Sequence, residues 1–371
     1  MAWSFTLARI AGTRVRIHLT FILFLAWIGI TFWRSGSPTD AVVGVLYVVT
    51  VFLCVLAHEF GHAIAALRYG ITTPSITLYP IGGIARLTRI PKDPKQELIV
   101  AMAGPLVNFL IATLLVLVGG GLPTRELSFP PSGGSQFLAT LLWINLFLGV
   151  FNLIPAFPMD GGRILRALLG FFTSRERATA IAAATGQSLA LCGGILGIFT
   201  GNPILLLISV FVFFAAKSEE SLVNTEHLLT GMTAREASLS EFHTVKMDDS
   251  LESVIDHVLH SSQVDFPVIN DHGQCVSIAT QAELFKALRE QGSEAKVSDL
   301  VETIPAQIDG DTPLLEAWER LRSSRLPAAA VTDETGRLTA WLTLGNLSEV
   351  IMTRSALEEF AWRQQHERGS S

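Results

Sequence analysis

Charged side chains are scarce in this chain of 371 residues, of which Asp, Glu, Lys and Arg make up only 16%. About 25% is usual for a soluble globular protein. The shortage is uneven: charges are sparse up to about Ala216, and from Lys217 onward the composition is that of an ordinary acidic soluble domain. The mean hydropathy of +0.44 predicts a membrane protein. With a net charge of −6 and no basic patch, no nucleic-acid partner is expected.

Cysteine is also rare, with three scattered residues and no C-x-x-C spacing. This pattern excludes a disulfide framework and suits a soluble part that faces the cytosol. Cys54 and Cys192 lie in apolar runs, where we expect them to pack as small hydrophobic residues. The first apolar run is long enough to span a membrane and no small-residue cleavage site follows it, so we expect no cleavable signal peptide.

Long apolar runs fill the first part of the chain. A membrane-spanning helix needs roughly 20 mostly apolar residues. Six runs approach this length, over residues 17–33, 41–67, 98–120, 137–157, 178–199 and 203–216. The last is short, and only its apolar density and the need to return the chain argue that it spans. We therefore predict a multi-pass α-helical membrane domain over residues 1–216, with six transmembrane helices.

The basic residues of the short loops predict the orientation, because Lys and Arg concentrate on the cytoplasmic side. Three groups fall on one side of the predicted membrane: Arg9, Arg14, Arg16; Arg68, Arg86, Arg89, Lys92, Lys95; and Arg163, Arg166, Arg175, Arg177. The opposite loops hold only Arg34 and Arg125. This bias places the N-terminus and the C-terminal domain in the cytoplasm, with the spans in the plasma or inner membrane.

Residues 71–87 differ from both spans and loops. The segment alternates weakly like strands and contains Pro74, Pro80 and the pair Gly82-Gly83. It is too apolar for a plain solvated loop, and non-helical backbone at membrane depth must be satisfied by protein or by a water-filled cavity. We predict a re-entrant β-hairpin near the second span. A surface hairpin is the alternative.

The motif H-E-x-x-H occurs once, as His58-Glu59-Phe60-Gly61-His62. The i, i+4 spacing places both imidazoles on one helix face, where they can share one metal ion. Glu59 stands beside them and can accept a proton from a water molecule bound to the metal. Ionisable groups at the end of an apolar span are costly and usually functional. The alternative is that the histidines merely face a headgroup region.

Asp160 is the best candidate for the third ligand that a catalytic zinc ion usually needs. It follows Asn152-Leu-Ile-Pro155-Ala-Phe-Pro158-Met, where prolines break the fourth helix and glycines after Asp160 allow close backbone approach. The predicted topology puts Asp160 and the two histidines at the same membrane depth. Taken alone, Asp160 would rather cap a turn. The coincidence in depth favours one joint metal site.

These residues together resemble the site-2 protease family of intramembrane metalloproteases. HEFGH is followed by N-x-x-P-x-x-P-x-D-G-G, and the third span carries G-P-x-x-N as Gly104-Pro105-Leu-Val-Asn108. The resemblance covers roughly residues 1–216. The sequence is similar to the compact branch of the family, which lacks a PDZ domain. The resemblance implies that His58, His62 and Asp160 bind one zinc ion, and that Glu59 is the catalytic acid and base.

The resemblance also implies a substrate, a membrane protein with a transmembrane segment that is cut within the lipid bilayer. Asn108 and Asn152 are candidates to stabilise the oxyanion, with buried helix contacts as their rival use. The Gly82-Gly83 hairpin resembles the re-entrant loop of the family. Edge-strand pairing there would satisfy the backbone of an unwound substrate.

The soluble part, residues 231–371 after a linker at 217–230, shows a weak internal repeat over about 232–288 and 297–357. Each copy has a polar lead, an amphipathic helix, an apolar strand, a Gly turn, a second strand and a helix. The repeat resembles a CBS domain pair, an α/β module that often binds adenine nucleotides.

The CBS pattern ends in Thr, two residues, then Asp, but this chain has Thr280 with Glu283 and Thr343 with Asn346. Two roles of the CBS pair are therefore open. ATP or AMP could bind at these residues and regulate the enzyme, or the pair could dock on the membrane domain or form a homodimer.

Two other functions would fit parts of the sequence. A channel or transporter gated by the CBS pair would suit six spans but leaves the H-E-x-x-H and Asp motifs without a role. A non-catalytic scaffold with the same fold is disfavoured because His58, Glu59, His62 and Asp160 are all present.

Overall fold

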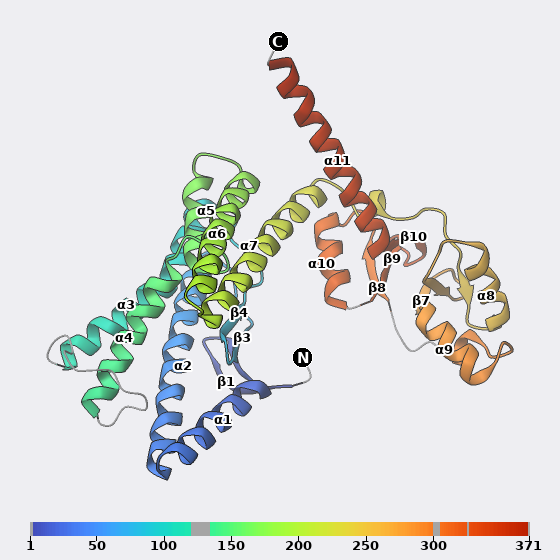
Figure 1. Cartoon of the computed structure of the whole chain (residues 1–371). Coiled ribbons are helices and arrows are strands. Elements are labelled where there is room, and N and C mark those ends of the chain that lie inside the picture. Colours follow the sequence, from blue (N-terminus) through green and yellow to red (C-terminus); the bar gives the residue numbers. More distant parts are fainter. Residues whose placement is uncertain (1–2, 120–133, 300–304, 325, 370–371) are drawn as a thin grey trace. The chain divides into compact units, whose positions relative to one another are not determined.

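A computed structural model describes residues 3–119, 134–299, 305–324 and 326–369 (Figure 1). The chain divides into two compact units, Met1–Val223 and Asn224–Ser371. The first is mostly helical and the second is α/β, as expected from the change in composition. The limits 1–216 and 231–371 remain predictions.

Seven helices and a small sheet make up the described part of the first unit. The helices are α1 (Leu19–Ser35), α2 (Pro38–Leu67), α3 (Pro94–Gly119), α4 (Gly134–Asn152), α5 (Asp160–Gly170), α6 (Arg175–Phe199) and α7 (Pro203–Leu229). The sequence explains why α2 begins at Pro38. Proline favours the first turn of a helix, and Ser37 and Asp40 form a capping box. The fourth helix ends at Asn152, before the two prolines that were predicted to break it.

Four helices in the described residues are long and apolar enough to cross a membrane: α2, α3, α4 and α6. Helix α1 is apolar but shorter. Helix α7 starts at Pro203, as predicted, but continues to Leu229, so most of the predicted linker is helical. The apolar helical region is confirmed, and the number of six spans remains a prediction.

The sheet of the first unit has the order β1-β2-β3-β4, formed by β1 (Ser4–Ile10), β2 (Thr13–His18), β3 (Ser75–Tyr79) and β4 (Gly82–Arg86). Strands β3 and β4 form an antiparallel hairpin within the segment 71–87, and β2 runs parallel to β3. Strands β1 and β2 were not expected, because Arg14 and Arg16 were interpreted as loop charges. Strand β2 nevertheless alternates these arginines with the apolar Val15 and Ile17, and Val15 is buried.

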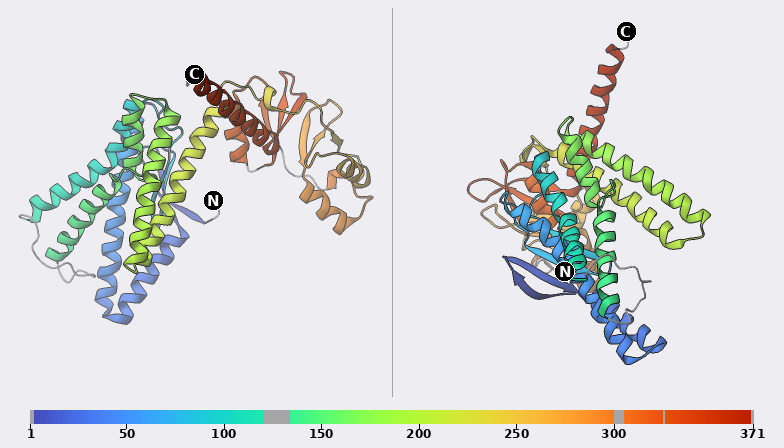
Figure 2. Two further views of the ribbon diagram at one scale, coloured as in Figure 1. Left: turned by 45° about the horizontal axis from the view of Figure 1, so that its top comes forward. Right: turned by 90° about the vertical axis from the view of Figure 1, so that its left-hand side faces the viewer.

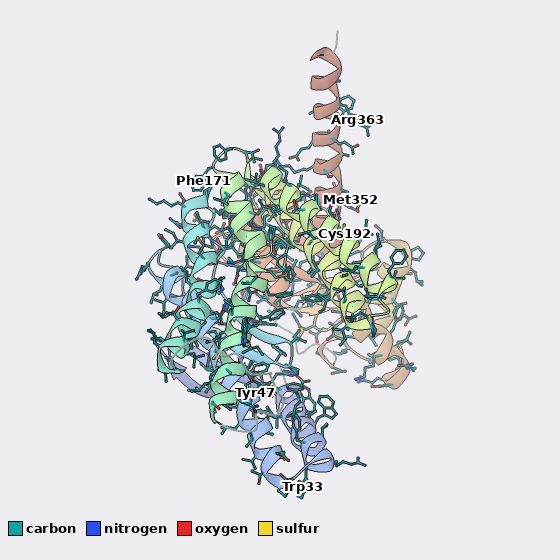
Figure 3. The ribbon with its side chains drawn as sticks, turned by 60° about the vertical axis from the view of Figure 1, so that its left-hand side comes forward. Trp33, Tyr47, Phe171, Cys192, Met352 and Arg363 are labelled. Carbon is teal, nitrogen blue, oxygen red and sulfur yellow. The ribbon has the colours of Figure 1, made fainter. Side chains whose placement is uncertain are left out.

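The surface of the helices carries many apolar side chains. Leu53, Leu110, Phe147, Leu191 and Leu207 are each more than half exposed. Cys54 is buried as expected, whereas Cys192 lies exposed on α6 (Figure 3). The expectation that Cys192 would pack inside the protein was wrong, because an apolar run does not reveal which face of its helix meets other helices.

A buried ion cluster joins three helices of this unit. Arg166 on α5 is 1% exposed; its Nε donates to Glu97 Oε1 at 2.8 Å and its Nη1 donates to Glu219 Oε1 at 2.7 Å. Glu97 lies on α3 and Glu219 on α7. Removing one partner of such a cluster leaves an uncompensated buried charge, which costs about 3–5 kcal/mol. The cluster therefore fixes α5, the helix that begins at Asp160.

The second unit contains two copies of one arrangement, a three-stranded sheet with two helices (Figure 2). The first copy is β5 (Val245–Lys246), α8 (Leu251–His260), β6 (Phe266–Ile269), β7 (Cys275–Ala279) and α9 (Gln281–Gln291). The second is β8 (Ala306–Asp309), α10 (Leu314–Ser324), β9 (Ala328–Thr332), β10 (Leu338–Thr343) and α11 (Leu344–Gly369). In each copy the first strand is parallel to the second, and the third is antiparallel. The predicted order of helices and strands is present. Strands β5 and β8 were not predicted, because they lie in the segments that were interpreted as polar leads.

The two copies share an apolar cluster. Cys275 and Ile278 of β7 pack with Ala328, Ala330 and Trp341 of the second copy. Burial raises the pKa of the Cys275 thiol to about 12. This cysteine is therefore a protonated core residue at neutral pH and not a nucleophile.

Candidate active site and metal centre

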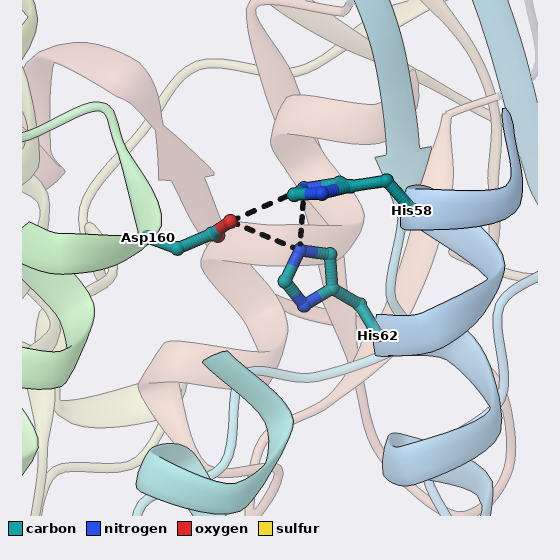
Figure 4. A group of neighbouring side chains, drawn as sticks. All are labelled: His58, His62 and Asp160. Atoms are coloured by element: carbon teal, nitrogen blue, oxygen red, sulfur yellow. Dashed lines mark hydrogen bonds and ion pairs between the residues drawn. The ribbon is translucent and has the colours of Figure 1, made fainter. Parts of the chain in front are cut away.

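Three side chains converge between α2 and the start of α5 (Figure 4). His58 and His62 are one helical turn apart on α2, and Asp160 points at both imidazoles from the first residue of α5. Asp160 Oδ2 lies 3.2 Å from each Nε2, and the two Nε2 atoms are 3.1 Å apart. Each of the three residues is 7% exposed.

The other ring nitrogen of each histidine fixes where the proton sits. His62 Nδ1 lies 2.7 Å from the carbonyl oxygen of Val100, which can only accept a hydrogen bond. His58 Nδ1 lies 2.6 Å from Asn108 Oδ1, also an acceptor. Both Nδ1 atoms therefore donate, and in the neutral rings both Nε2 atoms present lone pairs to each other and to Asp160.

Three electron-rich atoms facing one another fit a cation better than they fit each other. Asp160 Oδ2 is buried and has no hydrogen-bond partner among the described residues, although it sits beside both rings. Tetrahedral zinc with bonds of about 2.0–2.1 Å places its ligand atoms about 3.3 Å apart. The observed separations of 3.1–3.2 Å are close to that value. Two imidazoles and a carboxylate, with outer hydrogen bonds that orient the rings, suit catalytic zinc.

The backbone around the site is unusually close-fitting. A Cβ added to Gly104 of α3 would lie 2.2 Å from His62 Nε2 and 2.7 Å from His58 Nε2. A Cβ on Gly161 would lie 2.2 Å from the carbonyl oxygen of Ile154. Glycine at these positions lets α3 approach the rings, and lets α5 turn tightly enough to aim Asp160 at them.

A cavity of about 340 Å³ opens beside the His58 ring. Its walls include His58 and Glu59 of α2, Asn152 of α4, and Gly82 and Gly83 of the hairpin. A Cβ on Gly83 would lie 2.9 Å from Glu59 Cγ, so the hairpin backbone passes directly over the Glu59 side chain. The remainder of the wall is mostly apolar: Val51, Phe52, Val55, Pro80, Ile81, Ile144, Leu148 and Phe151, with Asn108. The cavity brings the Glu59 carboxylate, the His58 imidazole and two asparagine amides together in a largely apolar space.

The two candidate asparagines differ in what they contact. Asn108 is fully buried, and both ends of its amide are engaged: Oδ1 with His58, and Nδ2, which donates to Asn145 Oδ1 at 3.0 Å. Asn152 is half-buried, and its Nδ2 donates to the Leu148 carbonyl at 3.0 Å. Asn108 therefore serves the histidine, and Asn152 is the amide with capacity left towards the cavity.

Sequence reasoning quoted Gly104 as part of G-P-x-x-N without a role for it, and it missed the Val100 carbonyl and Asn145. A signal for Asn145 was present, because it precedes Asn152 by seven residues in an apolar run. Two helical turns place both amides on one face.

In the second unit, the candidate nucleotide residues form helix caps. Thr280 Oγ1 donates to Glu283 Oε2 at 2.7 Å in a capping box at the start of α9. Thr343 Oγ1 donates to Asn346 Oδ1 at 2.5 Å at the start of α11. Each pair thus has a local structural use.

Comparison with known proteins adds independent information. The model of peptidase family M50 matches residues 46–127 and 128–193, and the CBS domain model matches 234–290 and 297–353. A zinc metalloprotease of Methanocaldococcus jannaschii is 36% identical over 324 residues, covering 87% of this chain and 90% of the relative. Rip3 of Mycobacterium tuberculosis is 28% identical over 373 residues, covering 93% and 92%.

Among solved structures, the site-2 protease from Methanocaldococcus jannaschii is 41% identical. The match covers 59% of this chain and 95% of the chain in the solved structure, with a TM-score of 0.44.

Proposed function

Because the chain belongs to peptidase family M50, the zinc-dependent site-2 proteases, and carries a CBS pair, we propose that it cleaves membrane-spanning protein substrates within the bilayer. The observation that carries the proposal is the convergence of His58, His62 and Asp160 beside the Glu59 carboxylate and an apolar cavity. The rival, a CBS-gated channel or transporter, gives no reason for three buried lone pairs to meet at one point.

In the proposed site, His58, His62 and Asp160 hold the metal. A bound zinc ion supplies Lewis acidity, which polarises a peptide carbonyl and makes a water nucleophile available near neutral pH. Glu59 accepts the proton of the attacking water and delivers it to the leaving amine. The Asn108 and Val100 contacts keep both rings aimed at one point while this happens.

Asn152 is the proposed oxyanion donor. It lines the same cavity as His58 and Glu59, and it retains donor capacity because only one contact of its Nδ2 is made, to Leu148. An oxyanion donor of this type contributes about 3 kcal/mol to the transition state. Asn108, whose amide is fully engaged, is better suited to orient His58.

The surface of the first unit supports a place in the plasma or inner membrane. Its helices expose apolar side chains that lipid would cover. Trp33 and Phe171, 65% and 51% exposed, lie at opposite ends of the unit (Figure 3), and an exposed Trp at one end suits a membrane interface. With the asymmetry of Lys and Arg, this supports six spans, with the N-terminus and the CBS pair in the cytoplasm.

The proposed entry of the substrate is through the hairpin. A substrate helix hides its carbonyls in its own hydrogen bonds, so it must unwind before it is cut. Strand β4 is last in the order of the described sheet, and its first two residues, Gly82 and Gly83, line the cavity, so its outer edge can receive an extended segment. This is the role we propose for a re-entrant hairpin.

Replacing Ile84 with proline is expected to lower the cleavage rate about tenfold, since loss of one backbone donor and local distortion of β4 cost about 1.4 kcal/mol. Ile84→Ala, which keeps the backbone N–H, is the control and should cleave at near the normal rate. Cleavage is measured on a membrane-spanning substrate together with the zinc content of each variant. Equal rates in Ile84→Pro and the unmodified chain would remove strand pairing from the proposal.

The function itself is tested with the purified full chain in lipid nanodiscs containing a substrate with one transmembrane segment. Cleavage is expected, with loss of activity on chelation and recovery when one equivalent of zinc is restored. Ion or solute flux without any cleavage would instead support the channel or transporter.

Regulation through the CBS pair is a further part of the proposal, with ATP or AMP as the ligand and a homodimer as the assembly. A ligand changes the rate only if it binds one state of the enzyme better than the other. The same cleavage assay with ATP or AMP added decides this, because an unaltered rate discards nucleotide control.

A further inference from the structure

A chain of buried hydrogen bonds crosses three helices and ends at the metal centre. Asn145 on α4 donates from Nδ2 to the Leu141 carbonyl at 2.8 Å, and its Oδ1 accepts from Asn108 Nδ2 at 3.0 Å. Asn108 Oδ1 in turn accepts from His58 Nδ1 at 2.6 Å. Both asparagines are 0% exposed. Polar groups buried in apolar helices persist only where their hydrogen bonds are satisfied.

The direction of every bond in this chain follows from its first link. A backbone carbonyl can only accept, so the end of the Asn145 amide that faces Leu141 must be the NH₂ group. The oxygen of Asn145 then faces Asn108 and requires an NH₂ group there. This requirement turns the oxygen of Asn108 towards His58, which must therefore carry its proton on Nδ1 and keep the Nε2 lone pair free.

Without Asn145, Asn108 could present either end of its amide to His58, because the two ends of an amide have nearly the same shape. The rotated amide would place NH₂ against His58 Nδ1, which would move the ring proton to Nε2, where it blocks a metal. With Asn145 in place, that rotation sets two oxygens against each other. His62 needs no such relay, since the Val100 carbonyl fixes it directly.

We infer that Asn145 is a positioning residue of the metal centre, acting through Asn108 to hold His58 in its metal-binding tautomer; this rests on the proposed function. Asn145 is not among the residues that line the cavity, and its hydrogen bond to Asn108 links it to His58. The competing use of such an amide is simple adhesion between α3 and α4. The two uses predict different zinc affinities.

The test compares zinc dissociation constants, by competition with a chromophoric chelator, for the full chain and its Asn145→Leu and Asn145→Asp variants. Asn145→Leu is expected to bind zinc about 10–100-fold more weakly, the usual effect of losing an outer partner of a metal ligand. Asn145→Asp, protonated at this fully buried position, donates its O–H to the Leu141 carbonyl and keeps an oxygen towards Asn108, and it should stay within about threefold of the unmodified chain. Leu142→Ala, a packing loss at a buried neighbour on α4, is the control and should leave zinc affinity unchanged.

Saturating zinc is expected to restore most of the cleavage by Asn145→Leu, because the ligands themselves remain. Normal zinc affinity in folded Asn145→Leu, or an equal loss in Leu142→Ala, would reduce Asn145 to helix adhesion and overturn the inference. If Asn145→Leu does not accumulate, Asn145→Ala is measured with the same two outcomes. Failure of the unmodified chain to bind zinc or cleave would refute the proposed function instead.

Discussion

Glu59→Gln is expected to lower the cleavage rate by about 10²–10⁴-fold, the usual contribution of a general acid–base group. The amide has nearly the shape of the carboxylate, so the contact with the Gly83 backbone and the cavity wall should persist. It cannot accept a proton from water. Zinc content should be unchanged, because the proposed ligands are His58, His62 and Asp160.

The control for this variant is Glu220→Gln, which removes one carboxylate from the same unit, at a partly buried position where it pairs with the exposed Lys217. It should cleave at the normal rate. The measurement combines cleavage of a membrane-spanning substrate with metal analysis of both proteins. A normal rate in Glu59→Gln would exclude Glu59 as the base, and loss of zinc along with activity would assign it a structural role.

The meeting of His58, His62 and Asp160 could be predicted from the sequence because two kinds of information agree on it. The i, i+4 spacing fixes His58 and His62 on one helix face whatever the surroundings. The positions of the apolar runs then place Asp160 at the same depth. The structure brings the three side chains together, and no knowledge of helix rotation was needed to expect this.

The support for the triad could not be predicted in the same way. Whether Asn108 meets His58, an oxyanion or another helix depends on how α2, α3 and α4 are rotated about their axes, and spacing along one helix carries no such information. A role for Asn145 can be inferred only once it is known which end of the Asn108 amide faces His58. Strands β1 and β2 were missed for a different reason: a six-residue alternation of Arg with Val and Ile is short, and charges before a first apolar run also indicate topology.

The glycine of G-P-x-x-N provides the other large expected effect. Gly104→Ala should weaken zinc binding more than about 100-fold and abolish cleavage. The new methyl group would lie 2.2 Å from His62 Nε2 and 2.7 Å from His58 Nε2, well inside van der Waals contact. The rings cannot swing aside cheaply, because Asn108 and Val100 hold their Nδ1 atoms. Relief must come from moving α3 or breaking those bonds, and either change separates the ligands.

Gly119→Ala is the matched control, since it adds the same methyl group to the same helix where no described atom lies within 4 Å. It should bind zinc and cleave normally, because alanine is also the better helix former. Zinc affinity and thermal unfolding of both variants are measured in nanodiscs, so that a folded protein without zinc is distinguished from a misfolded one. Normal zinc binding by Gly104→Ala would mean that the metal does not lie between these imidazoles. The lone-pair geometry at His58, His62 and Asp160 would then need another explanation.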